Sequence, residues 1–226
     1  MTVITAVKKG DEIAIACDTQ TSKGNFRIKY LSDFKVNDSK LLTYGESTLG
    51  FSGTVAIHQI FEDLFATTTP APFTTRQEIF QWMLSQHDTL KNHYYLKTDA
   101  GNNKNQVTET NWISALVANP HGIFGIGAYR EVTEYSKFWA VGSGANFALG
   151  AMDILYEQPL SASEIAEAAA LTATKFDPAC APPIYVKTIQ PAKKAKRQKT
   201  GQKASQKTGQ KAGQKTRKRA SKKTAS

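Results

Sequence analysis

β-Branched and apolar residues at the start of the chain follow the pattern of β-strands. The first two such runs, 2–9 (TVITAVKK) and 11–19 (DEIAIACDT), are separated by a turn at Lys9 and Gly10. Similar runs recur later and predict further strands at 34–38, 41–47, 47–53, 111–120, 121–129, 130–136, 137–144 and 182–189.

Four other segments repeat apolar residues every three or four positions, which is the spacing of amphipathic helices. These predicted helices span 54–68, 74–96, 145–158 and 161–176. Two of them begin with the pattern of a capping box, Thr75 followed by Glu78 and Ser161 followed by Glu164. Residues 97–110 are polar and rich in turn-forming residues, so we expect a loop there.

The order of the predicted elements indicates the fold class. Strands are followed by two helices, more strands, two more helices and a last strand. Each sheet and each helix must bury an apolar face, and two antiparallel sheets covered by helix pairs satisfy that need. We therefore expect an α+β protein with a four-layer αββα sandwich. A β/α barrel or a doubly wound sheet would need regular alternation of strands and helices, which the chain lacks.

The net charge of +10 is concentrated at one end of the chain. Residues 191–226 hold fourteen of the 29 Lys and Arg residues and no acidic residue, which leaves fifteen basic against 19 acidic residues elsewhere. This tail repeats QK and two further residues five times and has no aromatic residue. It cannot bury enough apolar surface to offset the entropy of ordering. We expect one folded domain over 2–190 and a disordered Lys-rich tail over 191–226.

The basic tail has two interpretations. A lysine-rich segment without acidic residues can contact phosphates without sequence preference, which makes nucleic acid or another polyanion a candidate partner. Without aromatic side chains it cannot stack on bases. The alternative is a solvated appendage that aids solubility.

Several classes of protein are disfavoured by the composition. No run of eighteen apolar residues exists, so no transmembrane helix is expected, and the first twenty residues lack the apolar core of a secretory signal. Cys17 and Cys180 lie far apart without CxxC spacing, which favours a reducing cytoplasm over a disulfide framework or a zinc site. We expect no metal and no cofactor, because metal-ligand spacing is absent from His58, His87, His93 and His121.

Thr2 could carry chemistry if Met1 is removed. An N-terminal threonine combines a hydroxyl nucleophile with a free α-amine, whose reference pKa is near 8 and which can take the hydroxyl proton. A nearby ammonium would lower the pKa of that amine, and an aspartate would hold the ammonium in place. Threonine is common at position 2, so this residue alone does not indicate an enzyme.

The segment 2–25 resembles the opening of proteasomal β subunits and HslV-type peptidases, which are N-terminal nucleophile (Ntn) hydrolases. In that family an aspartate follows the nucleophile by sixteen residues, and Asp18 follows Thr2 by sixteen. Four further motifs occur in the family's order: FKV, GFSGTVA, AVGSGANFALGA and SASEIAEAAALTATKFD. The resemblance covers about residues 2–189. Among the family's branches, the betaproteobacterial proteasome homologue (BPH) resembles this chain most, followed by the ancestral β type, Anbu.

The resemblance implies a catalytic role for each matching residue. Thr2 Oγ would attack a peptide carbonyl, and the Thr2 amine would act as the general base. Lys35, in the FKV motif, would be held by Asp18, would tune the amine and would stabilise developing negative charge. The backbone N–H of Gly53 would donate to the tetrahedral oxyanion.

Other matching positions would support the nucleophile and the substrate. Ser143 and Asp177 match a serine and an aspartate that orient the nucleophile's amine. Ser22, Gly50 and Cys180 are the expected substrate-binding residues. Gly50 matches the floor of the family's S1 pocket, where a glycine leaves room for a large apolar side chain. Cys180 stands where the family has a serine, and a thiol is the poorer hydrogen-bonding partner.

The function implied is that of a self-compartmentalising threonine peptidase, in which Met1 is the entire prosegment. It would hydrolyse peptide bonds of unfolded proteins or peptides inside a homo-oligomer of stacked rings, with seven-fold favoured over six-fold symmetry. Folded substrates would need an unfoldase ATPase or a prior unfolding event. Two alternatives stay open: an Ntn amidohydrolase acting on a small amide, and an inactive ring scaffold that binds polyanions through its tail.

Overall fold

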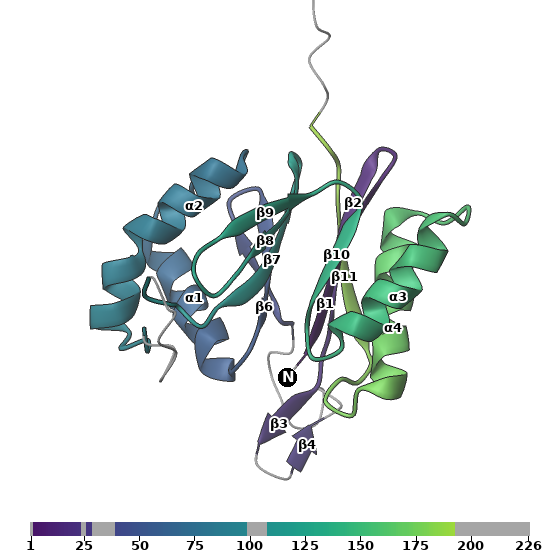
Figure 1. Cartoon of the computed structure of the whole chain (residues 1–226), viewed down its shortest axis with the longest axis horizontal. Coiled ribbons are helices and arrows are strands. Elements are labelled where there is room, and N and C mark those ends of the chain that lie inside the picture. The colour runs from purple at the N-terminus through teal and green to yellow at the C-terminus, as the bar shows by residue number, and fades with distance from the viewer. Residues whose placement is uncertain (1, 24–25, 29–38, 99–107, 193–226) are drawn as a thin grey trace, which may run out of the picture. The chain divides into compact units, whose positions relative to one another are not determined.

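Two antiparallel sheets lie face to face between two pairs of helices in the computed structural model (Figure 1), which describes residues 2–23, 26–28, 39–98 and 108–192. The first sheet has the order β10–β1–β2–β11 and the second the order β5–β6–β7–β8–β9. The first comprises β1 (Val3–Lys9), β2 (Glu12–Asp18), β10 (Phe138–Gly142) and β11 (Ile184–Ile189). The second comprises β5 (Leu41–Tyr44), β6 (Ser47–Ser52), β7 (Ser114–Asn119), β8 (Gly122–Ile126) and β9 (Val132–Tyr135).

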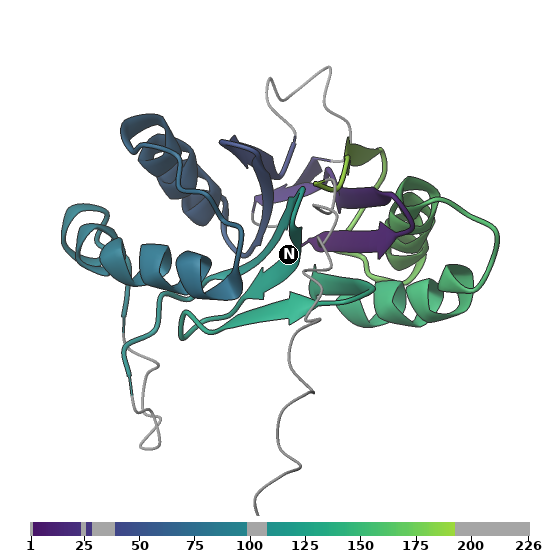
Figure 2. The same cartoon turned by 90° about the horizontal axis from the view of Figure 1, so that it is seen from above.

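Helices cover the outer face of each sheet, as the two views at right angles show (Figure 1, Figure 2). The helices are α1 (Val55–Thr67), α2 (Arg76–Ser85), α3 (Ala145–Tyr156) and α4 (Ala162–Phe176), with a π-helical turn η1 (Thr89–His93). A separate pair of short strands, β3 (Thr21–Lys23) and β4 (Phe26–Ile28), extends from the end of β2. The predicted αββα sandwich is confirmed.

The central strands of the first sheet are buried on both faces. In β1, Ile4 packs in the cluster between the two sheets, whereas Val3 and Val7 pack in the cluster beneath α3 and α4. In β2, Ile15 and Ala16 divide between the same two clusters in the same way. The two-residue period therefore directs alternate side chains into two separate apolar layers.

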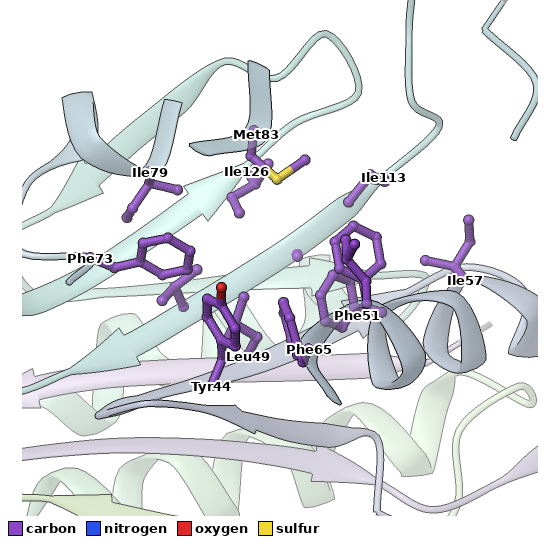
Figure 3. Close-up of a cluster of buried hydrophobic side chains, with 14 of the residues drawn as sticks. Tyr44, Leu49, Phe51, Ile57, Phe65, Phe73, Ile79, Met83, Ile113 and Ile126 are labelled. Atoms are coloured by element: carbon purple, nitrogen blue, oxygen red, sulfur yellow. The ribbon is translucent and has the colours of Figure 1, made fainter. Parts of the chain in front are cut away.

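The two helix layers pack with side chains of different size. On the face of α4 that meets the first sheet the buried residues are mainly alanines, so the helix lies close to β1, where Thr5 Oγ1 donates to the carbonyl oxygen of Ala166 at 2.9 Å. Beneath α1 and α2 the core is aromatic (Figure 3). The rings of Tyr44 and Phe65 stack with centroids 4.4 Å apart, as do those of Phe51 and Phe61.

Both predicted capping boxes are present, at Thr75 with Glu78 and at Ser161 with Glu164. The predicted single helix over 74–96 is interrupted after Ser85, and the wider turn of η1 leaves Leu90 fully buried against the aromatic core. The predicted strand at 34–38 and the tail from 193 onward lie outside the described residues. No helix in the described ranges has the length and apolar character needed to cross a bilayer.

Gly50 allows the two sheets to approach each other. A Cβ at this position would lie 2.6 Å from Cγ2 of Ile4 and 3.1 Å from Cδ2 of Leu41. Replacing Gly50 by Ala should therefore overpack the layer between the sheets and lower the free energy of unfolding by about 1–3 kcal/mol. Chemical denaturation of both proteins measures this difference.

Gly150 provides the matched control because it lies inside α3, where an added Cβ would meet no atom within 4 Å. Gly150→Ala should stabilise the protein by about 0.5–1 kcal/mol, since alanine has the higher helix propensity. Equal effects of the two substitutions would contradict this account of the sheet spacing.

Candidate active site

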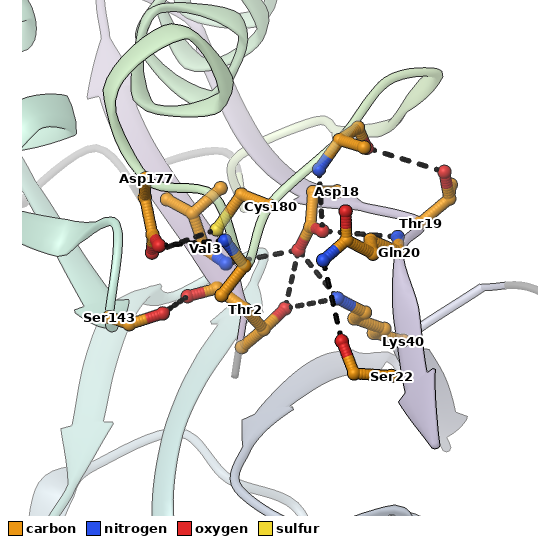
Figure 4. A network of polar contacts seen from close by, with 12 residues as sticks. Thr2, Val3, Asp18, Thr19, Gln20, Ser22, Lys40, Ser143, Asp177 and Cys180 are labelled. Carbon is orange, nitrogen blue, oxygen red and sulfur yellow. Dashed lines mark hydrogen bonds and ion pairs between the residues drawn. The ribbon is translucent and has the colours of Figure 1, made fainter. Parts of the chain in front are cut away.

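Thr2 lies at the start of β1, where the hairpin with β2 brings it beside a carboxylate (Figure 4). The two strands pair antiparallel with Ile4 opposite Cys17, so Asp18 falls beside the first residues of β1. Thr2 Oγ donates to Oδ1 of Asp18 at 2.6 Å, and the threonine is only 2% exposed. The hairpin of β1 and β2 therefore explains why residues sixteen positions apart in the sequence are in contact.

The carboxylate of Asp18 is fully buried and accepts five hydrogen bonds. Oδ1 accepts from the hydroxyl of Thr2, the backbone N–H of Val3 and the ammonium of Lys40. Oδ2 accepts from the backbone N–H groups of Gln20 and Ala181, at 3.1 and 3.3 Å. A buried charge is tolerated only when it is paired and hydrogen-bonded, and these donors meet both conditions.

The ammonium beside Thr2 belongs to Lys40. Its Nζ lies 2.6 Å from Oδ1 of Asp18 and donates to Oγ of Thr2 at 2.7 Å, so the three groups form a closed triangle. Lys35, the lysine expected from the FKV motif, lies outside the described residues. Lys40 is not among the residues expected from the sequence motifs.

A signal for Lys40 exists in the hairpin that follows it. Gly45, with φ +58°, forms the turn between β5 and β6, and pairing places Leu41 opposite Gly50. Continuing this register by one step sets Lys40 opposite Phe51, at the end of the hairpin that leads into Gly53. The register of this hairpin, rather than the FKV motif, is therefore the sequence signal that points to Lys40.

The carbonyl of Thr2 is enclosed by the segment that follows β10. Gly142 has φ +103°, and a Cβ there would lie 2.1 Å from the Thr2 carbonyl oxygen, so only glycine fits. Ser143 Oγ and the backbone N–H of Gly144 both donate to this oxygen, at 3.4 and 3.3 Å. The GSG sequence thus fixes the backbone of the threonine.

Asp177 and Cys180 lie in the segment that follows α4, behind Thr2 (Figure 4). Cys180 Sγ donates to Oδ2 of Asp177 at 3.2 Å. Burial raises the pKa of Asp177, but hydrogen bonds from Ser143, the Ala179 N–H and Cys180 outweigh burial and lower the pKa below its ordinary value. Burial, followed by the nearby carboxylates of Asp18 and Asp177, raises the pKa of the Cys180 thiol. The thiol therefore stays protonated and serves as a hydrogen-bond donor.

A cavity of about 490 Å³ opens in front of Thr2. Its wall comes from the residue before β3, from β3, from the two residues before β5, from β6 and from the start of α1. The lining residues are Thr2, Gln20, Thr21, Ser22, Ser39, Lys40, Phe51, Gly53, Thr54, Val55, His58, Gln59 and Glu62. Gly53 has φ +138° and borders the cavity between β6 and α1. The space is open to a chain that approaches the hydroxyl of Thr2.

The expected residues other than Lys35 and Gly50 lie at the cavity or around Thr2. Thr2, Ser22 and Gly53 border the cavity, and Asp18 contacts Thr2 from behind. Ser143 and Asp177 lie on the side of Thr2 away from Lys40 and Ser22 (Figure 4). Neither they nor Cys180 are among the lining residues of the cavity.

Gly50 is not brought to the cavity. Its position faces Ile4 between the sheets, and Phe51 borders the cavity instead. Among the described residues, no group of three or more His, Cys, Asp or Glu side chains is arranged to hold a metal ion.

The ion pair of Lys40 with Asp18 gives a stability prediction. Lys40→Met would leave the buried carboxylate without its cation, so we expect the free energy of unfolding to fall by about 3 kcal/mol. Lys187→Met is the matched control, because Lys187 is exposed and donates to the neutral hydroxyl of Thr43. That variant should change stability by less than about 0.5 kcal/mol. Urea denaturation of both variants measures the difference, and an equal loss in the two would refute the role of the pair.

Comparisons with known proteins place this geometry in a family. No family model and no curated protein sequence matches the chain. Among solved structures, Thiobacillus denitrificans BPH in complex with epoxomicin is 34% identical, with a TM-score of 0.77 over 84% of this chain and 99% of that one. The structure titled Thiobacillus denitrificans BPH is 33% identical over the same shares, also with a TM-score of 0.77.

A more distant neighbour shares the fold. HslV from Trypanosoma brucei is 19% identical, with a TM-score of 0.55 over 83% of this chain and 99% of that chain. The two-sheet architecture, the identity with BPH across nearly its whole length and the arrangement around Thr2 agree with one another. The chain belongs to the proteasome β-subunit and HslV-type family of Ntn hydrolases, in which BPH is one of its relatives.

Proposed function

We propose that this protein is a threonine peptidase whose nucleophile is Thr2 after removal of Met1. The observation that carries the proposal is the closed triangle of Thr2 Oγ, Lys40 Nζ and Asp18 Oδ1, with sides of 2.6–2.7 Å, at the mouth of a cavity. A hydroxyl that contacts an ammonium in a buried setting is poised to ionise when a base removes its proton.

The base in this proposal is the α-amine that processing would expose on Thr2. Its reference pKa is near 8, and the ammonium of Lys40 beside the same residue favours the neutral amine. The amine takes the hydroxyl proton as the Thr2 oxygen forms a bond to the substrate carbonyl carbon. It then returns the proton to the leaving amine as the C–N bond breaks, and water releases the acyl group from Thr2 by the reverse sequence.

Gly53 is the proposed donor to the oxyanion. It borders the cavity together with Thr2, and its positive φ is a conformation that residues with a Cβ rarely adopt. A preorganised backbone N–H at the developing oxyanion contributes about 3 kcal/mol to catalysis. Lys40 adds a positive charge in contact with the nucleophile's oxygen.

Ser143, Asp177 and Cys180 are the proposed positioning residues for the nucleophile. Ser143 donates to the carbonyl of Thr2, and Cys180 donates to Asp177. Asp177 supplies a negative charge on the side of Thr2 away from the cavity, where it would attract the protonated form of the new amine. In this arrangement the thiol of Cys180 performs the task for which the family uses a serine.

The proposed substrates are peptides and unfolded proteins, since an extended chain can enter the cavity beside β3. We also propose the assembly that the family resemblance implies, a homo-oligomer of stacked rings in the cytoplasm, with seven-fold symmetry favoured. An unfoldase ATPase is the proposed source of unfolded substrate. Polyanion binding by residues 191–226 is proposed from their charge alone.

Epoxomicin tests the nucleophile directly, because a BPH structure contains this ligand. Intact mass spectrometry should first show that Met1 is absent. Incubation with epoxomicin should then add the mass of one ligand per chain and abolish hydrolysis of fluorogenic peptides. A processed chain that forms no adduct and cleaves no peptide would refute the peptidase proposal.

Two variants identify the reacting atom. Thr2→Ala should form no adduct and show no hydrolysis above background, whereas Thr2→Ser should keep both to a lower extent, because serine retains the hydroxyl and the amine. Hydrolysis of a small amide but of no peptide would indicate the alternative Ntn amidohydrolase. Polyanion binding without any hydrolysis would indicate the scaffold.

Lys40 and Lys35 can be separated by a paired substitution. Lys40→Met should lower kcat/KM by about 100-fold or more, because it removes a charge that contacts the nucleophile. Lys35→Met should retain activity within about threefold. Circular dichroism establishes that both variants are folded, and Lys40→Arg provides a second variant that keeps the charge. A large loss in Lys35→Met with normal activity in Lys40→Met would reverse the assignment.

A further inference from the structure

The first two turns of α1 form one wall of the cavity. Val55, His58, Gln59 and Glu62 all line it, at the three- and four-residue spacing of one helix face. The opposite face of the same helix is buried in the aromatic core. The helix therefore presents a fixed set of side chains to whatever occupies the cavity.

The nature of this wall changes with distance from Thr2. Near the threonine it is apolar, with the ring of Phe51 and the side chain of Val55, which is 56% exposed. Farther along α1 it becomes polar at Gln59 and ends at the carboxylate of Glu62. A side chain that fills this space would meet apolar atoms first and a negative charge last.

Charge in the cavity is unbalanced. Among the described residues that line the cavity, Lys40 and Glu62 carry a charge, and the ammonium of Lys40 is already paired with Asp18 at 2.6 Å. Within the described ranges no ion pair to Glu62 is formed. The carboxylate of Glu62 is the cavity charge that a ligand can still neutralise.

The dimensions suit a long side chain. Glu62 lies seven positions after Val55 in α1, which corresponds to a rise of about 10 Å along the helix axis. Side chains on a helix tilt toward its N-terminus, so the carboxylate of Glu62 reaches back toward Gly53 and Thr2. An extended lysine or arginine side chain spans about 6–7 Å from its Cα, and a hydrogen bond adds about 3 Å.

We propose that the cavity selects substrates with lysine or arginine on the acyl side of the cleaved bond (P1), and that Glu62 is the residue that recognises the positive charge. This inference rests on the proposed peptidase function, because it requires the acyl carbonyl to lie between Thr2 and Gly53. The apolar stem of the P1 residue lies against Phe51 and Val55, and its charged end pairs with Glu62. This proposal differs from the expectation of a large apolar P1 residue, which depended on Gly50 as the floor of the S1 pocket.

The experiment compares two fluorogenic peptides that differ only in P1, arginine in one and citrulline in the other. Citrulline keeps the shape of arginine without its charge, so the ratio of the two kcat/KM values reports charge recognition. We expect a ratio of about two to five in the wild-type protein, the range for a solvent-accessible ion pair. Glu62→Gln should bring the ratio to about one, and Glu62→Lys should bring it below one.

Asp63→Asn is the matched control. It removes the same charge from the next residue of α1, whose carboxylate accepts from the hydroxyl of Tyr94 and does not line the cavity. This variant should keep the wild-type ratio. Raising the salt concentration should reduce the ratio in the wild-type protein and leave that of Glu62→Gln unchanged.

The outcomes separate the two proposals. Hydrolysis with a wild-type ratio of one, or a ratio that Glu62→Gln leaves unchanged, overturns the role of Glu62 and leaves the peptidase proposal standing. An equal change in Asp63→Asn also overturns it, since the effect would then reflect general charge. Absence of both hydrolysis and an epoxomicin adduct overturns the peptidase function and this inference with it.

Discussion

The buried carboxylate of Asp18 is the group on which the rest of the site depends. Its five hydrogen bonds come from Thr2 and Val3 at the beginning of β1, the second residue after β2, the residue before β5 and the segment before β11. A buried charge that loses its partners costs several kcal/mol, so these segments must meet at one point for the domain to be stable. The ammonium of Lys40 that neutralises the buried aspartate also contacts the hydroxyl of Thr2. The contacts that stabilise the buried charge are thus the same contacts that assemble the candidate active site.

The packing on each side of the first sheet keeps this point rigid. The alanine-rich face of α4 allows close approach of helix and strand, and Gly142 allows the backbone after β10 to contact the carbonyl of Thr2. Larger residues at these places would force the segments apart, because protein interiors have few voids to absorb added volume. Across the second sheet, the aromatic core beneath α1 holds that helix in place as a cavity wall. Thr2 therefore has closely packed backbone on one side and the cavity on the other.

Much of the architecture was predictable because it follows from local pattern. The periods of two and of three to four residues identified the strands of both main sheets and the four α-helices, but not the short pair β3 and β4. The capping boxes at Thr75 and Ser161 marked two helix starts. The pairing of Thr2 with Asp18 was expected from the family resemblance, and its physical basis is a tight hairpin, which fixes which residues lie opposite each other. The interruption of the helix after Ser85 was not predictable from the sequence, because the wider π-helical turn has no clear periodic signal.

The sequence by itself determined the layer order, because each periodic segment must bury its apolar face, and its resemblance to the proteasomal family identified Thr2 as the nucleophile candidate and Asp18 as its carboxylate. The tertiary structure alone decided which lysine completes the triangle and which side chains face the cavity. Lys40 reaches Asp18 across more than twenty residues, and the path of such a connection is not set by local preference. Position 50 faces the other sheet while position 51 faces the cavity, because successive strand residues point to opposite sides. A shift of one residue in register therefore changes which residue contacts the substrate, and only the folded arrangement of both sheets fixes that register.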